Sequence, residues 1–176
     1  MSDLFSQKEL SFSQAIAATQ FLMERINAKE LSEAEIKQEI SLILTTKNGG
    51  RGFFVSYLTS EMTLADHPSP GIINGLKFSA EVASELLVKN LAMSSAMIVT
   101  HTRNNDPKNA EGSQRVYQRT SNLIQQTKLE LVQNKLQKLQ DTIEGVDVEY
   151  QEFLERWNYD LEQKKAIKKA VIRVLI

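Results

Sequence analysis

The chain has 176 residues, 41% of them hydrophobic and 24% charged, and its formal net charge is −1. This length suits one globular domain, and a net charge so close to zero gives no overall attraction to nucleic acid or acidic lipid. There is no cysteine, which excludes disulfides, cysteine nucleophiles and cysteine metal sites and agrees with a reducing cytoplasm.

The N-terminal residues lack the pattern of a signal peptide, which is a basic stretch followed by an apolar one, so we expect no signal peptide.

Two amphipathic helices are expected at the start of the chain. Between residues 8 and 28, apolar side chains recur at steps of three and four, as on one face of a helix. A second helix is expected after Ser32, because Ser32 and Glu35 have the spacing of a capping box.

The segment KNGGRG, residues 47–52, has two competing interpretations. Gly49 is expected to end the preceding helix as a left-handed cap residue, so that residues 53–62 form a third helix. The alternative is an α+β fold with one small β-hairpin near residues 40–59, since both flanks are rich in strand formers and Asn-Gly favours a hairpin turn. The capping box at Ser32 favours the helical interpretation.

A central apolar helix is expected over residues 79–101, after a proline-containing loop at residues 65–71 and a short turn of helix. Ser79 is the expected N-cap. This helix carries apolar side chains on all of its faces, which is typical of a helix buried among other helices. Because Glu85 and Lys89 lie in its middle, we expect a core helix and no transmembrane segment.

One long helix is expected from about residue 114 to 144, ended by Gly145. The preceding residues 102–113 carry no large apolar side chain, so we expect a solvated loop there. The second half of the long helix has the alternating three- and four-residue spacing of a coiled-coil seam. This heptad seam consists of Leu129, Val132, Leu136, Leu139 and Ile143.

Two shorter helices are expected at the C-terminal end. Asp147 is expected to cap the first. Its buried side chains are expected to be Phe153, Leu154 and Trp157. Asp160 and Gln163 have the spacing of a capping box for the second, whose opposite face is basic and expected to lie in solvent. Its apolar face consists of Ile167, Ala170, Val171, Val174 and Leu175.

Candidate ligand-binding residues are few. KNGGRG offers backbone amides and Arg51 to a phosphate, although it lacks the lysine and hydroxyl residue of a Walker A loop. The candidate side chains either have purely structural roles or line a ligand-binding pocket together. The residues of that pocket would be Arg51, His67, His101 and Arg103. No His-x-x-x-His or Glu-x-x-His pair stands on an expected helix, so we predict no metal site and no cofactor.

Nucleic-acid binding is the least favoured hypothesis. Arg115 and Arg119 are one helical turn apart and could contact phosphates. A single basic helix face in a nearly neutral protein is usually solvated, and no nucleic-acid-binding motif is present. We therefore expect these arginines to be ordinary surface side chains.

The predicted fold is an all-α, single-domain bundle of about six or seven helices over residues 1–176, arranged around the central helix at 79–101. We predict a non-catalytic cytoplasmic protein that acts through protein–protein contacts, as a homodimer or with a helical partner, because the heptad seam can pair within or between chains. No residue has the neighbours of a catalytic nucleophile, so no catalytic residue is assigned. The alternative is a small enzyme or ligand-binding protein with a pocket near Arg51, His67 and His101.

Overall fold

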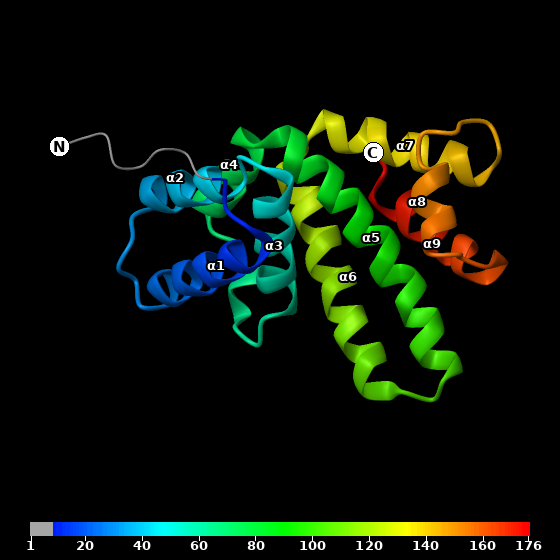
Figure 1. Cartoon of the computed structure of the whole chain (residues 1–176), viewed down its shortest axis with the longest axis horizontal. Coiled ribbons are helices and arrows are strands. Elements are labelled where there is room, and N and C mark those ends of the chain that lie inside the picture. The colour runs from blue at the N-terminus through cyan, green and yellow to red at the C-terminus, as the bar shows by residue number, and fades with distance from the viewer. Residues whose placement is uncertain (1–8) are drawn as a thin grey trace. The chain divides into compact units, whose positions relative to one another are not determined.

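The computed structural model describes residues 9–176 of the chain. Within that range the chain forms nine α-helices, one short 3₁₀-helix and no strand (Figure 1). The predicted all-α fold is confirmed, and the alternative β-hairpin near residues 40–59 is wrong. The backbone contacts divide the chain into two compact units, Met1–Ala83 and Ser84–Ile176, and the single-domain organisation stays a prediction.

The first unit consists of helices joined by short turns. Capping boxes start its first two helices, with Ser11 and Gln14 at one and Ser32 and Glu35 at the other. The second of these confirms the capping box predicted from the sequence. The helices are α1 (Phe12–Asn27), α2 (Glu33–Ile43), α3 (Lys47–Thr59), the 3₁₀-helix η1 (Thr63–Ala65) and α4 (Pro70–Phe78).

Glycines let the helices of the first unit approach closely. A Cβ added at Gly52 of α3 would lie 2.4 Å from the Ala15 Cβ of α1. A Cβ added at Gly75 of α4 would lie 2.8 Å from the Ile40 Cβ of α2. Real Cβ atoms do not come so close, so both positions require glycine for this packing. The resulting helix pairs are α1 with α3 and α2 with α4.

KNGGRG is helical, which corrects the expected loop. Helix α3 begins at Lys47, and the Thr46 side chain caps it by accepting a hydrogen bond from the Gly49 amide at 3.0 Å. A Cβ added at Gly49 would lie 1.9 Å from the Ile43 carbonyl oxygen. The glycines therefore serve close packing at the start of a helix, and this tertiary requirement outweighs their preference for turns.

The second unit contains most of the central helix. Helix α5 (Ala80–Arg103) begins directly after Ser79, close to the predicted start, and carries many fully buried side chains, among them Leu87, Val88, Leu91 and Ala92. It is long and apolar enough to cross a membrane, but 56% of its most apolar window is buried inside the protein. This burial is that of a core helix in a soluble protein.

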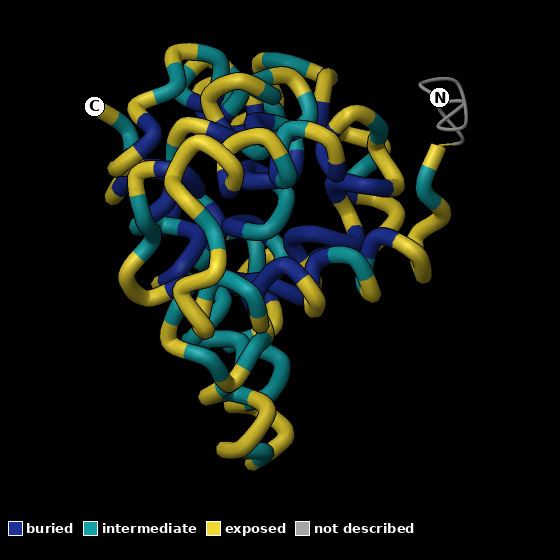
Figure 2. The backbone as a smooth tube through the Cα atoms, turned by 90° about the vertical axis from the view of Figure 1, so that its left-hand side faces the viewer, coloured by how far each residue is buried: buried dark blue, intermediate teal, exposed yellow. Residues whose placement is uncertain are grey.

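Helix α6 (Pro107–Thr127) occupies most of the segment expected to be a solvated loop. Asp106 caps it by accepting a hydrogen bond from the Asn109 amide at 3.2 Å, so only residues 104–106 connect α5 to α6. Helices α5 and α6 run antiparallel (Figure 1). No residue between 97 and 118 is buried, which explains why this segment carries the polarity of a loop (Figure 2).

The single long helix expected at residues 114–144 is two helices. Helix α6 ends at Thr127, and α7 covers Glu130–Ile143. Lys128 between them has a left-handed backbone with φ of 50°, and its amide donates to the Ile124 carbonyl. A left-handed residue ends an α-helix, because its carbonyl no longer points along the helix axis. Gly145, with φ of 79°, follows α7 as predicted.

The C-terminal helices are α8 (Gln151–Arg156) and α9 (Leu161–Val174). Leu154 is buried as predicted, whereas Trp157 is 51% exposed, which corrects its expected burial. The predicted capping box of Asp160 and Gln163 starts α9. Four residues of its predicted apolar face are buried, namely Ile167, Ala170, Val171 and Val174, whereas Leu175 follows the end of the helix and is only partly buried.

Candidate binding cleft

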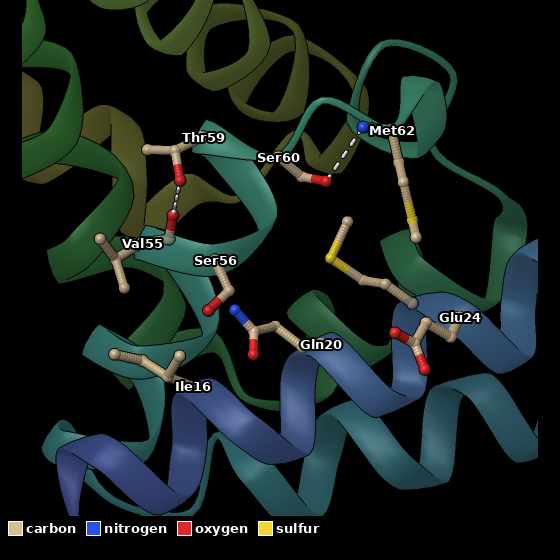
Figure 3. A pocket seen from close by; sticks show the side chains of 9 residues that line it. Ile16, Gln20, Glu24, Val55, Ser56, Thr59, Ser60 and Met62 are labelled. Carbon is tan, nitrogen blue, oxygen red and sulfur yellow. Dashed lines mark hydrogen bonds between the residues drawn. The ribbon is translucent and has the colours of Figure 1, made fainter.

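A cleft of about 460 Å³ lies in the first unit between α1 and α3 (Figure 3). This volume falls in the range of small-molecule sites in proteins. Four of its lining side chains are apolar and five are polar. The lining residues are Ile16, Gln20, Met23, Glu24, Val55, Ser56, Thr59, Ser60 and Met62.

Helix periodicity places these side chains on facing surfaces. Ile16, Gln20 and Glu24 follow each other at four-residue steps on α1, and therefore lie on one face of that helix. Ser56 and Thr59 lie on α3, one and two turns after Gly52. Because the helices touch at Gly52, the cleft opens beyond that contact toward the C-terminal end of α3.

The Ser56 hydroxyl is the unusual group of the cleft. Ser56 is only 9% exposed, and its Oγ has no hydrogen-bond partner among the described residues. The other two hydroxyls bond to backbone, since Thr59 donates to the Val55 carbonyl and Ser60 accepts from the Met62 amide (Figure 3). A buried hydroxyl without a partner is rare in native proteins and calls for an explanation.

Two polar side chains of α1 line the cleft, and one of them faces this hydroxyl (Figure 3). The Gln20 side chain points toward Ser56 from the opposite side of the cleft (Figure 3). Glu24, one turn further along α1, is the only charged side chain of the lining and forms no ion pair among the described residues. Its sequence neighbour Arg25 pairs instead with Glu30 at 3.8 Å and Glu39 at 4.0 Å. The cleft therefore carries a net negative charge.

The four residues of the predicted pocket lie elsewhere. Arg51 is exposed on α3 and stacks over the Phe12 ring at 5.2 Å from its centroid. His67 is exposed after η1, whereas His101 lies near the end of α5 in the second unit. Arg103 pairs with Asp160 at 2.5 Å and with Glu162. Both arginines are engaged locally, and a pocket that joins these residues stays a prediction.

No group of three or more His, Asp or Glu side chains with metal-binding geometry occurs in residues 9–176. Arg119 is only 4% exposed, so its guanidinium does not lie on a solvated basic face with Arg115. This burial corrects the expectation that Arg119 is an ordinary surface side chain, and nucleic-acid binding through Arg115 and Arg119 stays a prediction.

The heptad seam lies inside the chain. Val132, Leu136 and Leu139 are fully buried, and α7 packs against α9 in the second unit. Leu129 and Ile143 are partly buried. The buried members of the seam therefore contact other parts of the same chain, and self-association through the seam stays a prediction.

Sequence reasoning did not find Gln20, Glu24 or Ser56. The signal in the sequence was that Gln20 and Glu24 follow Ile16 at four-residue steps, so that polar side chains continue a helix face that begins with an apolar one. Ser56 likewise lies among the buried aromatic residues Phe53 and Tyr57. A serine on such a face is ordinarily satisfied by its own helix backbone, so its unpaired state is visible only in the structure.

Comparison with known proteins gives a family and no activity. The family model described as "Uncharacterised conserved protein UCP020893" matches residues 11–174. No curated protein and no solved structure matches the chain. The matched range includes every residue that lines the cleft.

Proposed function

Because the chain belongs to this uncharacterised conserved family, we propose a function from its own geometry: non-catalytic binding of a small organic molecule in the cleft between α1 and α3. The observation that carries the proposal is the buried Ser56 hydroxyl in the wall of that cleft, which has no hydrogen-bond partner within residues 9–176. A ligand with a hydrogen-bonding group would supply the missing partner.

The energetics favour such a ligand. Leaving a buried hydroxyl unpaired costs about 1–3 kcal/mol, part of which a bound polar group recovers. Ile16, Val55 and the two methionines, Met23 and Met62, offer apolar surface to the body of the ligand. Methionine side chains adapt their shape to different ligands because they are unbranched and polarizable.

Non-catalytic binding fits the same lining. A serine nucleophile needs an adjacent base that accepts its proton. The lining contains neither histidine nor lysine, and Ser56 makes no hydrogen bond to Glu24. A binding role therefore requires fewer additional groups than a catalytic one.

Methyl NMR of methionine tests the proposal with benzyl alcohol as the probe. Met23 and Met62 line the cleft, whereas Met93 and Met97 lie on α5 and serve as internal controls. We expect benzyl alcohol to shift the first pair selectively. Ser56→Ala should weaken binding about fivefold, which corresponds to about 1 kcal/mol for one hydrogen bond.

Ser121→Ala is the matched control for this experiment, because Ser121 lies on α6 outside the lining of the cleft and its hydroxyl donates to the Tyr117 carbonyl. It should leave the affinity unchanged. Absence of any shift at Met23 and Met62, or shifts there no larger than those of Met93 and Met97, would contradict the proposal.

Self-association in the cytoplasm is the second candidate function, and a surface of the first unit favours it. A shallow apolar groove of about 480 Å³ is formed mainly by α2 and by Phe78 at the end of α4. Phe78 is 72% exposed and Leu42 is 57% exposed, so the groove offers two large apolar side chains that a second copy of the chain could bury. The lack of cysteine supports the cytoplasmic location.

Light scattering tests this second candidate. If the chain forms a dimer through the α2–α4 groove, the double substitution Leu42→Gln with Phe78→Gln should yield a folded monomer. Ile172→Gln, at a 54% exposed position on α9, should not change the mass. A wild-type monomer at all accessible concentrations would exclude the candidate.

A further inference from the structure

We infer that the cleft between α1 and α3 selects ligands that carry a protonated amine, with Glu24 as the residue that recognises the charge. The inference rests on the proposed function, because it assumes that the cleft binds a small molecule. It adds the chemical class of that molecule and the residue that determines the preference.

The charge of the lining is one-sided. Glu24 carries the only ionic charge among the nine lining residues. The nearest cation in sequence, Arg25, forms ion pairs with Glu30 and Glu39 and a cation–π contact with Phe21. Glu24 is consequently not neutralised by its neighbour, and an anionic ligand would meet a repulsive charge in this cleft.

The neutral polar groups agree with the same ligand. A protonated amine is a pure hydrogen-bond donor and has no acceptor. Three lining side chains carry acceptor oxygens, namely the exposed Glu24 carboxylate, the exposed Gln20 amide and the buried Ser56 hydroxyl. These oxygens come from both walls of the cleft, as the positions of Gln20 and Ser56 show (Figure 3).

The apolar side chains define where the rest of the ligand lies. Ile16 and Val55 lie near Ser56, while Met62 lies across the cleft from Glu24 (Figure 3). Methionine sulfur makes favourable contacts with aromatic rings. An aryl alkylamine, with its ring between the apolar walls and its ammonium near Glu24, therefore satisfies the charged, polar and apolar parts of the cleft together.

Three probes of similar size and different charge test the inference. Benzylamine is cationic at pH 7, benzyl alcohol is neutral and benzoate is anionic. In titrations followed at the Met23 and Met62 methyl signals, we expect benzylamine to bind about fivefold tighter than benzyl alcohol, as one ion pair near the surface allows. Benzoate should bind most weakly, and added salt should reduce these differences.

Glu24→Gln separates the charge from the shape of the site. This substitution should reduce benzylamine to the affinity of benzyl alcohol, while the affinity for benzyl alcohol stays unchanged. Glu81→Gln, at an exposed position in the first turn of α5, makes the same change in net charge outside the lining and should leave all three affinities unchanged.

The outcomes distinguish the two proposals. Equal affinities of the wild type for benzylamine and benzyl alcohol would overturn amine selection and leave small-molecule binding intact. Tighter binding of benzoate would do the same. If none of the three probes shifts Met23 or Met62, both proposals are wrong.

Discussion

Tyr150 donates a hydrogen bond from its phenol to the Glu85 carboxylate, with 3.2 Å between the oxygen atoms. The same carboxylate pairs with the ammonium groups of Lys89 and Lys135, each at 3.0 Å. Glu85 and Lys89 belong to α5, Lys135 to α7, and Tyr150 precedes α8. One half-buried carboxylate thus joins α5, α7 and the residue that precedes α8 in the second unit.

Tyr150→Phe should lower the free energy of unfolding by about 1 kcal/mol, because it removes one hydrogen bond to a carboxylate that keeps two other partners. The phenylalanine retains the buried ring. Urea unfolding followed by circular dichroism at 222 nm measures the loss. Tyr159→Phe is the control, since the Tyr159 phenol has no hydrogen bond among the described residues, and equal losses in the two variants would contradict the role of Glu85.

The Glu85 network should make stability depend on acid pH. Burial raises the pKa of Glu85, but the hydrogen bonds from Lys89 and Lys135 outweigh it and hold the pKa below its usual value. A carboxyl with a lowered folded pKa stabilises the protein above its unfolded pKa of about 4.3, and this contribution is lost as the pH falls through the folded pKa.

Glu85→Gln therefore tests this dependence. The variant should be less stable than the wild type at pH 7, and the difference should shrink as the pH approaches 3. Urea midpoints at pH 7, 5 and 3 measure it. A difference that stays constant with pH would show that Glu85 acts through packing and not through its charge.

Local rules predicted much of the fold. The capping boxes at Ser32 and Asp160 depend only on residues three positions apart, and both occur in the structure. The buried face of α9 follows from helix periodicity alone. Such features are encoded within one or two turns of helix, so no knowledge of the partner helix is needed to find them.

Features that depend on a distant partner were not predictable in the same way. From its sequence alone, KNGGRG is predicted to be a turn. The segment is helical because Gly52 packs closely against Ala15, and this contact cannot be seen in the local sequence. Lys128 ends α6 in a left-handed conformation that its residue type does not favour. The candidate cleft was missed for the same reason, because an unpaired Ser56 hydroxyl is defined by its three-dimensional surroundings.

Gly52→Ala should destabilise the packing of α1 on α3. The added methyl would lie 2.4 Å from the Ala15 Cβ and 2.9 Å from the Phe12 carbonyl oxygen, so the helices must move apart. Overpacking of this kind costs about 1–3 kcal/mol. Gly112→Ala is the matched control, since a Cβ there meets no atom within 4 Å and alanine should stabilise α6 by about 0.5–1 kcal/mol.

Thermal and urea unfolding of both alanine variants measure these opposite effects. The structure requires a loss at Gly52 and a gain at Gly112. Equal gains at both positions would mean that the two helices are not in the close contact described. Because Gly52 lies at one end of the candidate cleft, its variant should also weaken the binding of benzyl alcohol.

Leu136→Ala tests whether the heptad seam is part of the interior of one chain. Leu136 is fully buried, so its truncation should cost about 2–5 kcal/mol in the free energy of unfolding and should leave the solution mass unchanged. Leu42→Ala is the control for stability, because Leu42 is 57% exposed and such surface substitutions usually change stability by less than about 0.5 kcal/mol. If Leu136→Ala instead converts a dimer into a folded monomer with little loss of stability, the seam lies between chains, and self-association would no longer depend on the α2–α4 groove.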